Sequence, residues 1–107
     1  MDHEIVRRIH KHAAQGAMLP INEWNDLIDL IEKILPDFYN FISRVDLSLT
    51  LQEKVICVLT RLHFIPTEIA TLLNLTKQRI SNLRRSLNKK IFNQEGSKTF
   101  TANIYRV

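Results

Sequence analysis

Hydrogen-bonding and cationic side chains recur along one side of the segment from Thr76 to Ile91. At about 100° per residue, an α-helix over this segment brings one polar set to a common face. That set is Gln78, Ser81, Asn82, Arg85 and Lys89. Because amide, hydroxyl and guanidinium groups form hydrogen bonds readily, this face suggests a polar binding partner.

The opposite side of the same segment is apolar. Its apolar residues recur at i, i+3, i+7 and i+11 and line one helical face; they are Ile80, Leu83, Leu87 and Ile91. Upstream, Thr67 to Leu73 predicts a shorter helix with Ile69 and Leu73 facing inward. A short helix, a three-residue turn and a longer basic helix are the pattern of a helix-turn-helix DNA-binding motif.

The turn between these two helices has suitable residues at each position. Ala70 is small enough for the helices to approach closely, and Leu75 supplies an apolar plug. Asn74 lies where many such motifs place glycine, and Asn is the residue other than glycine that best tolerates a positive φ. Thr76 is predicted to cap the second helix by accepting a hydrogen bond from the backbone N–H of Gln78 or Arg79.

Charge is distributed unevenly along the chain. The whole sequence has a net charge of +4. Residues 50–95 hold eight basic and three acidic residues, a net +5, whereas residues 1–49 hold five basic and eight acidic ones, a net −3. No acid occurs between Glu68 and Glu95. A basic segment of this kind favours contact with a phosphate backbone; the alternative is a solvated helical face that is merely basic.

The rest of the chain predicts helices that support this motif. Residues 2–15 predict a first helix that Gly16 ends, and the apolar face of a second helix contains Trp24, Leu27 and Ile31. A short helix follows Pro36, and Thr50 with Glu53 predicts a capping box for a helix reaching about His63. Pro66 can begin the helix that follows it. Three further N-caps are predicted, at Asn22, Asp37 and Ser97, the last for a short helix carrying Phe100 and Ile104.

The segment from Leu49 to Gly96 resembles the C-terminal DNA-binding domain of bacterial transcriptional regulators, related to the LuxR/GerE type and to region four of sigma factors. The likeness lies in the leading L-T-x-x-E, in P-T-E-I-A-T-L-L-N, and in I-S-N-x-R-x-S-L-x-K-K-I-F. Asn74 replaces the usual glycine. The resemblance implies that the helix matching Thr76 to Ile91 enters the major groove. In LuxR-type domains the last helix often forms a dimer, so a second copy of this chain is a candidate partner.

Site residues are assigned by their positions on the second helix and on the helix before it. The residues expected to read bases are Thr76, Lys77, Gln78, Ser81, Asn82 and Arg85. The residues expected to contact phosphate are Thr67, Thr71, Arg79, Arg84, Lys89 and Lys90. Arg84 is assigned to the residues that contact phosphate because it lies about 100° around the helix from Arg85.

Other chemistries lack suitable residues. Cys57 is a single cysteine in an apolar helical pattern, which fits a core residue in a reducing cytosol. His3, His10 and His12 do not have metal-ligand spacing, and no phosphate loop, nucleophile elbow or catalytic triad occurs. No apolar run approaches the roughly 20 residues of a membrane span. We therefore expect no enzyme activity, metal site, cofactor or membrane contact.

These observations predict an all-α fold, a small helical bundle with a C-terminal helix-turn-helix of three to four helices and two or three supporting helices before it. The expected divisions are supporting helices over 1–48, the DNA-binding domain over 49–96, and a tail or short helix over 97–107. The expected function is sequence-specific binding of double-stranded DNA in a cytoplasmic bacterial transcriptional regulator, with RNA polymerase as a further candidate partner. The alternative is a helical adaptor that docks on the transcription machinery without contacting bases.

Overall fold

Seven α-helices and one short 3-10 turn form the part of the chain that the structure, a computed structural model, describes, which is residues 4–107. No strand occurs within these residues, so the fold is all-α as predicted. The elements, in chain order, are α1 Glu4–Ala14, α2 Ile21–Ile34, α3 Pro36–Ile42, the 3-10 turn η1 Val45–Leu47, α4 Leu51–Arg61, α5 Pro66–Leu73, α6 Lys77–Phe92 and α7 Phe100–Tyr105.

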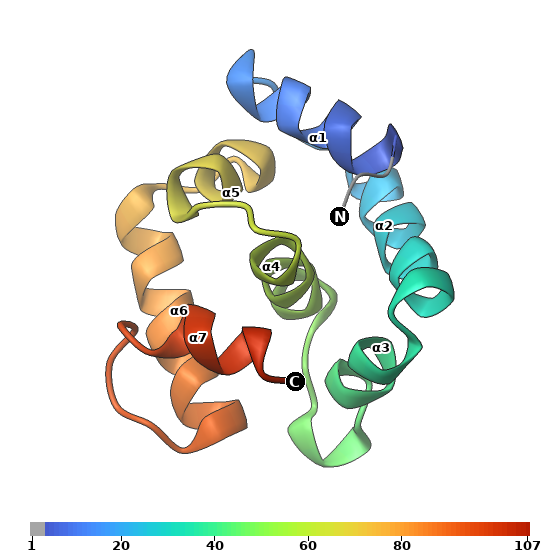
Figure 1. Ribbon diagram of the computed structural model, residues 1–107. Helices are drawn as coiled ribbons and strands as arrows, with labels where there is room; N and C mark the ends of the chain where they lie inside the picture. Colours follow the sequence, from blue (N-terminus) through green and yellow to red (C-terminus); the bar gives the residue numbers. More distant parts are fainter. Residues whose placement is uncertain (1–3) are drawn as a thin grey trace.

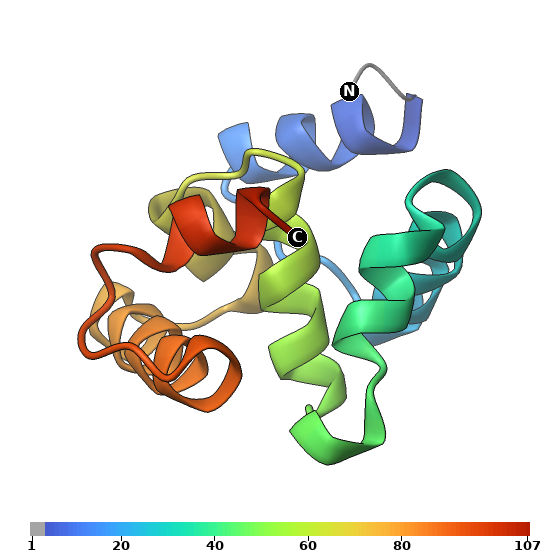
Figure 2. The ribbon, with the colours of Figure 1, turned by 60° about the horizontal axis from the view of Figure 1, so that its bottom comes forward.

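Helix α4 is the centre of the bundle. It contacts α2, α5, α6 and α7, so α2 and α3 lie on one side of it and α5, α6 and α7 on the other (Figure 1; Figure 2). Six consecutive residues of α4, Val55 to Thr60, are buried. A helix that is buried all round its axis must be covered by neighbours on every side, which explains its central place.

The predicted core of the motif is largely confirmed. Five of the apolar residues predicted in the motif are at most 5% exposed; they are Ile69, Ala70, Leu73, Ile80 and Leu87. They share a core cluster with Val55, Val58 and Leu59 of α4, whereas Leu75, Leu83 and Ile91 are partly buried and pack against this cluster. Cys57 is fully buried in the same core, and desolvation there raises the pKa of its thiol to about 12.

Local signals in the sequence place several helix ends correctly. The Thr50 hydroxyl accepts from the Glu53 N–H at 3.1 Å, and the Glu53 carboxylate accepts from the Thr50 N–H at 2.8 Å, so the capping box is present. Pro66 is the first residue of α5. Gly16, with φ of 71°, follows the end of α1 in a left-handed conformation that glycine adopts without strain. The first two residues of the predicted 2–15 helix, Asp2 and His3, lie outside the described residues.

The three other predicted N-caps are wrong. Helix α2 begins at Ile21 with Pro20 at its N-cap, so Asn22 lies inside the helix. Helix α3 begins at Pro36, whose fixed φ suits the first helical position, so the N-cap moves back to Leu35 and Asp37 lies in the first turn. Helix α7 begins at Phe100 with Thr99 at the N-cap position and without a side-chain cap, and Ser97 lies in the turn before it, where its carbonyl accepts from the Phe100 N–H.

The N-terminal helices are joined to the helix-turn-helix by specific contacts. Between α1 and α2, the Leu19 N–H donates to the Leu72 carbonyl of α5 at 2.8 Å. On α1, the His10 ring stacks on Phe64 with centroids 3.8 Å apart, and its Nδ1 lies 3.1 Å from Glu68 Oε2. These contacts hold α1 against α5, beside which it lies in Figure 1.

Candidate nucleic-acid interface

Helices α5 and α6 meet at a sharp turn that fixes their relative orientation. Asn74 adopts the left-handed conformation, with φ of 55° and ψ of 46°, as the sequence predicts. The Leu75 N–H then donates to the Ala70 carbonyl at 2.9 Å, and the Thr76 hydroxyl caps α6 by accepting from the Arg79 N–H at 3.0 Å. Both ends of the turn are therefore hydrogen-bonded, and α6 begins at Lys77.

The first half of α6 presents a polar face to solvent. Gln78, Asn82 and Arg85 are exposed, and Gln78 Nε2 donates to Asn82 Oδ1 at 3.0 Å. Thr76 and Lys77 are exposed at the start of the same helix, whereas Ser81 is partly buried. Five of the six predicted base-reading residues are thus exposed on α6 or at its N-cap. These amide and guanidinium groups match those that pair with adenine and guanine edges in the major groove.

Three cations near this face are free. Lys77, Arg79 and Arg85 are exposed, and their side chains form no ion pair or hydrogen bond with any residue in the range 4–107. An exposed cation without an internal partner gives up only water and counterions when it meets a phosphate. This region therefore has an accessible positive charge.

Arg84 is placed differently from its neighbour Arg85. Its guanidinium is half-buried against α7, where Nη2 donates to the Thr101 hydroxyl at 2.8 Å and Cζ lies 5.7 Å from the centre of the Phe100 ring. Burial lowers the pKa of this guanidinium. Arg84, predicted as a phosphate contact, thus has an internal partner in the free protein.

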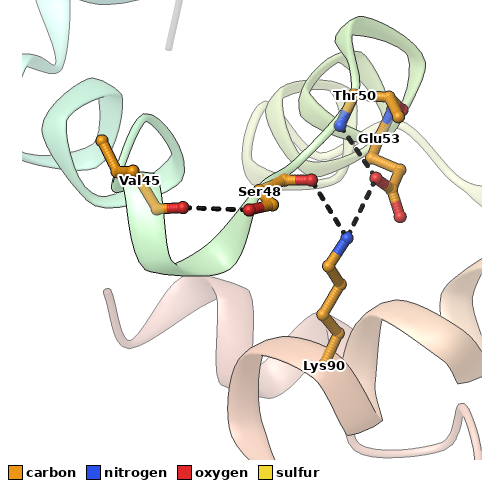
Figure 3. A network of polar contacts seen from close by, with 5 residues as sticks. All are labelled: Val45, Ser48, Thr50, Glu53 and Lys90. Atoms are coloured by element: carbon orange, nitrogen blue, oxygen red, sulfur yellow. Dashed lines mark hydrogen bonds and ion pairs between the residues drawn. The ribbon is translucent and has the colours of Figure 1, made fainter.

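The two lysines at the end of α6 also have partners within the chain. Lys90 Nζ donates to the Ser48 carbonyl at 3.1 Å and lies 3.5 Å from Glu53 Oε1, the same atom that accepts from the Thr50 N–H (Figure 3). Lys90 therefore joins the end of α6 to the beginning of α4. Lys89 Nζ lies 2.9 Å from Glu95 Oε1, and this hydrogen bond lowers the pKa of the Glu95 carboxyl.

The predicted phosphate contacts on α5 lie beside a shallow groove. Thr67 is exposed, Thr71 is partly buried, and the Thr71 hydroxyl donates to the Thr67 carbonyl at 3.2 Å. The groove is lined by both threonines together with Gly16, Ala70, Asn74, Leu75 and Lys77. Residues from the α1–α2 connection and from the start of α6 therefore border the same depression.

Asn88 is a buried polar residue of α6 to which the sequence alone assigned no role. It is fully buried, and its Nδ2 donates to the Gly96 carbonyl at 3.0 Å and to the Thr99 hydroxyl at 2.9 Å. Its Oδ1 accepts from Asn103 Nδ2 at 3.0 Å. The sequence does show that Asn88 lies four residues after Arg84, so the two side chains lie on the same side of the helix.

Residues 4–107 contain neither a metal-binding cluster nor a helix that could cross a membrane. No group of three or more His, Cys, Asp or Glu residues within 4–107 is arranged to hold a metal ion, and His3 lies outside that range. None of the helices in the described chain is long and apolar enough to cross a membrane.

Comparison with known proteins yields no relative. No protein-family model, curated protein or solved structure matches the chain.

Proposed function

We propose that this protein binds double-stranded DNA, with α6 in the major groove and α5 lying across the backbone. The observation that carries this proposal is the exposed face of α6, which combines Gln78, Asn82 and Arg85. In helix-turn-helix proteins the second helix of the motif contacts base edges through its N-terminal residues. The polar face of α6 begins at its N-terminus, as that geometry requires.

The surrounding charge supports the same partner. Among the residues that the structure describes, Lys77, Arg79 and Arg85 have no hydrogen-bond or ion-pair partner for their side chains, and α5 and α6 contain a single acid, Glu68. Glu68 is engaged, because its Oε1 accepts from the Ile65 N–H at 3.0 Å and its Oε2 lies against His10. A polyanion approaching this side therefore meets exposed cations and an acid whose carboxylate oxygens already have partners within the protein.

The size of α6 suits the groove. Its 16 residues give a helix about 24 Å long, and the major groove of B-DNA, about 12 Å wide, admits an α-helix. We extend the proposal to a cytoplasmic transcriptional regulator of the bacterial helix-turn-helix type, the class that the sequence resembles. An adaptor docking on the transcription machinery without base contacts is the outcome that the experiment below would reveal instead.

The test is selection of binding sites from random duplex DNA, followed by affinity measurements over a range of salt concentrations. We expect a defined sequence motif to be enriched, with affinity that falls as salt rises. Salt-dependent binding with no enriched motif would mean contact with the backbone alone. Absence of duplex binding at low salt would overturn the proposal and favour the adaptor.

A further inference from the structure

Arg84 and Asn88 form hydrogen bonds that connect α6 to the chain that follows it. They lie one turn apart on the same side of the helix. Arg84 donates to Thr101 on α7, and Asn88 contacts Gly96, Thr99 and Asn103. This side of α6 is distinct from the exposed side that carries Asn82 and Arg85.

Helix α7, which lies next to these hydrogen bonds, is itself held in the core. Phe100 and Ile104 of α7 are fully buried, and α7 contacts α4 as well as α6. Asn103 also donates to Gln94 Oε1 at 3.0 Å, and the Thr99 hydroxyl donates to the same oxygen at 2.7 Å. Helix α7 lies beside α6 in Figure 1 and also packs against α4. The hydrogen bonds from α6 therefore connect it to an element that α4 holds in place.

We propose that Arg84 is a positioning residue, which sets the rotation of α6 about its axis and does not itself contact DNA. The apolar stripe of α6 fixes one side of the helix, and a single stripe leaves some freedom to roll. The hydrogen bond to Thr101 and the contact with the Phe100 ring add a second direction of restraint. This proposal rests on the proposed function, because the restraint matters for aiming Gln78, Asn82 and Arg85 at bases.

Releasing the Arg84 side chain to contact phosphate would cost free energy. To reach a phosphate, the Arg84 guanidinium would give up its hydrogen bond to Thr101 and its place over the Phe100 ring. Arg85, one residue later, has no side-chain hydrogen bond or ion pair within residues 4–107 to lose. Binding energy is therefore gained more readily from Arg85 than from Arg84.

The sharpest test changes the acceptor and leaves Arg84 in place. Thr101→Val keeps the side-chain shape and all charges but removes the hydroxyl. We expect affinity for the selected DNA site to fall on the order of tenfold, as when one base contact is lost, with little change on random duplex or in the salt slope. If Arg84 is instead a phosphate contact, the freed guanidinium should leave affinity unchanged or raise it. That result would overturn the proposal.

Two further variants separate positioning from a loss of stability. Ala102→Val is the matched control, because Ala102 is exposed on α7 and its side chain takes no part in the hydrogen bonds of Arg84 and Asn88. This variant should bind DNA like wild type. Arg84→Met keeps an apolar stem near Phe100 and should lower site preference without lowering the salt slope, whereas a lost phosphate contact lowers that slope by about 0.9. All binding is measured where circular dichroism shows the variants to be folded. Folded variants with wild-type preference would contradict a positioning role.

A measurement without DNA keeps this proposal separate from the proposed function. Backbone amide NMR shifts of the Thr101→Val variant are compared with those of wild type and Ala102→Val. We expect changes to extend along α6 to Gln78 and Asn82, on the side away from α7. Shift changes confined to α7 and Arg84 would overturn the positioning role, whether or not wild type binds DNA. Absence of DNA binding by wild type would instead refute the proposed function.

Discussion

Asn82 and Asn88 lie on the same helix, as do Arg85 and Arg84, but the members of each pair have different surroundings. Asn82 and Arg85 face solvent. Asn88 is fully buried and joined to three other residues, and Arg84 is half-buried against α7. The same types of side chain are thus exposed to solvent at Asn82 and Arg85 but hydrogen-bonded within the protein at Asn88 and Arg84. Residue type alone does not distinguish these uses, because both depend on what lies beside each face of α6.

The largest effect is expected from the buried asparagine. Asn88→Ala removes the partner of the Gly96 carbonyl, of the Thr99 hydroxyl and of one Asn103 amide hydrogen. Asn103 is buried, so losing this partner is costly, and the hydrogen bonds to the partly buried Gly96 and the exposed Thr99 are lost as well. We therefore expect the free energy of unfolding to fall by about 3 kcal/mol, measured by chemical denaturation. The matched variant Asn82→Ala is exposed and should change stability by less than about 0.5 kcal/mol. Equal losses for the two variants would remove the distinction between the two faces.

The second effect is the salt dependence of duplex binding. Counting six phosphate contacts predicts a loss of about a thousandfold in affinity between 50 and 200 mM salt. Three cations of α6, Lys77, Arg79 and Arg85, form no ion pair or hydrogen bond through their side chains within residues 4–107, and Arg85 is expected to read a base. Two phosphate contacts, from Lys77 and Arg79, give a slope of about 1.8 and a loss of about tenfold over the same range. A slope near five would mean that Arg84, Lys89 and Lys90 leave their internal partners when DNA binds.

The third effect concerns base preference. Arg85→Ala should cost about 1–3 kcal/mol of binding free energy on the selected site and relax preference at one base position. Its thermal unfolding should match that of wild type, because Arg85 is exposed and its side chain forms no hydrogen bond or ion pair in the described part of the chain. Measurement combines repeated site selection with a thermal melt. Uniform weakening on all sequences would instead assign Arg85 to phosphate.

The smallest effect compares two lysines at opposite ends of α6. Lys90→Met loses the hydrogen bond to the Ser48 carbonyl and the contact with Glu53, so unfolding free energy should fall by about 1 kcal/mol. Its salt slope should stay unchanged. Lys77→Met should do the reverse, leaving stability unchanged and lowering the slope by about 0.9. A lower slope for Lys90→Met would show that Lys90 contacts DNA.

The sequence by itself determined the features whose interactions span only a few residues. The capping box of Thr50 and Glu53, the left-handed Asn74 and the Thr76 cap were predictable because each depends on backbone groups within four positions. The apolar stripes were predictable because helical periodicity relates sequence to face directly. Even among local features, Asp37 was misassigned as an N-cap, because the proline before it takes the first helical position.

Only the tertiary structure decided which polar residues of α6 are available to a partner. The partner of Arg84 is 17 residues away, that of Lys90 is 42 away, and His10 meets Glu68 over 58 residues. Helical periodicity indicates the direction in which a side chain points, but not what packs there. Arg84, Asn88 and Lys90 acquire their roles because α7 and the start of α4 lie against those directions, which only the folded chain specifies.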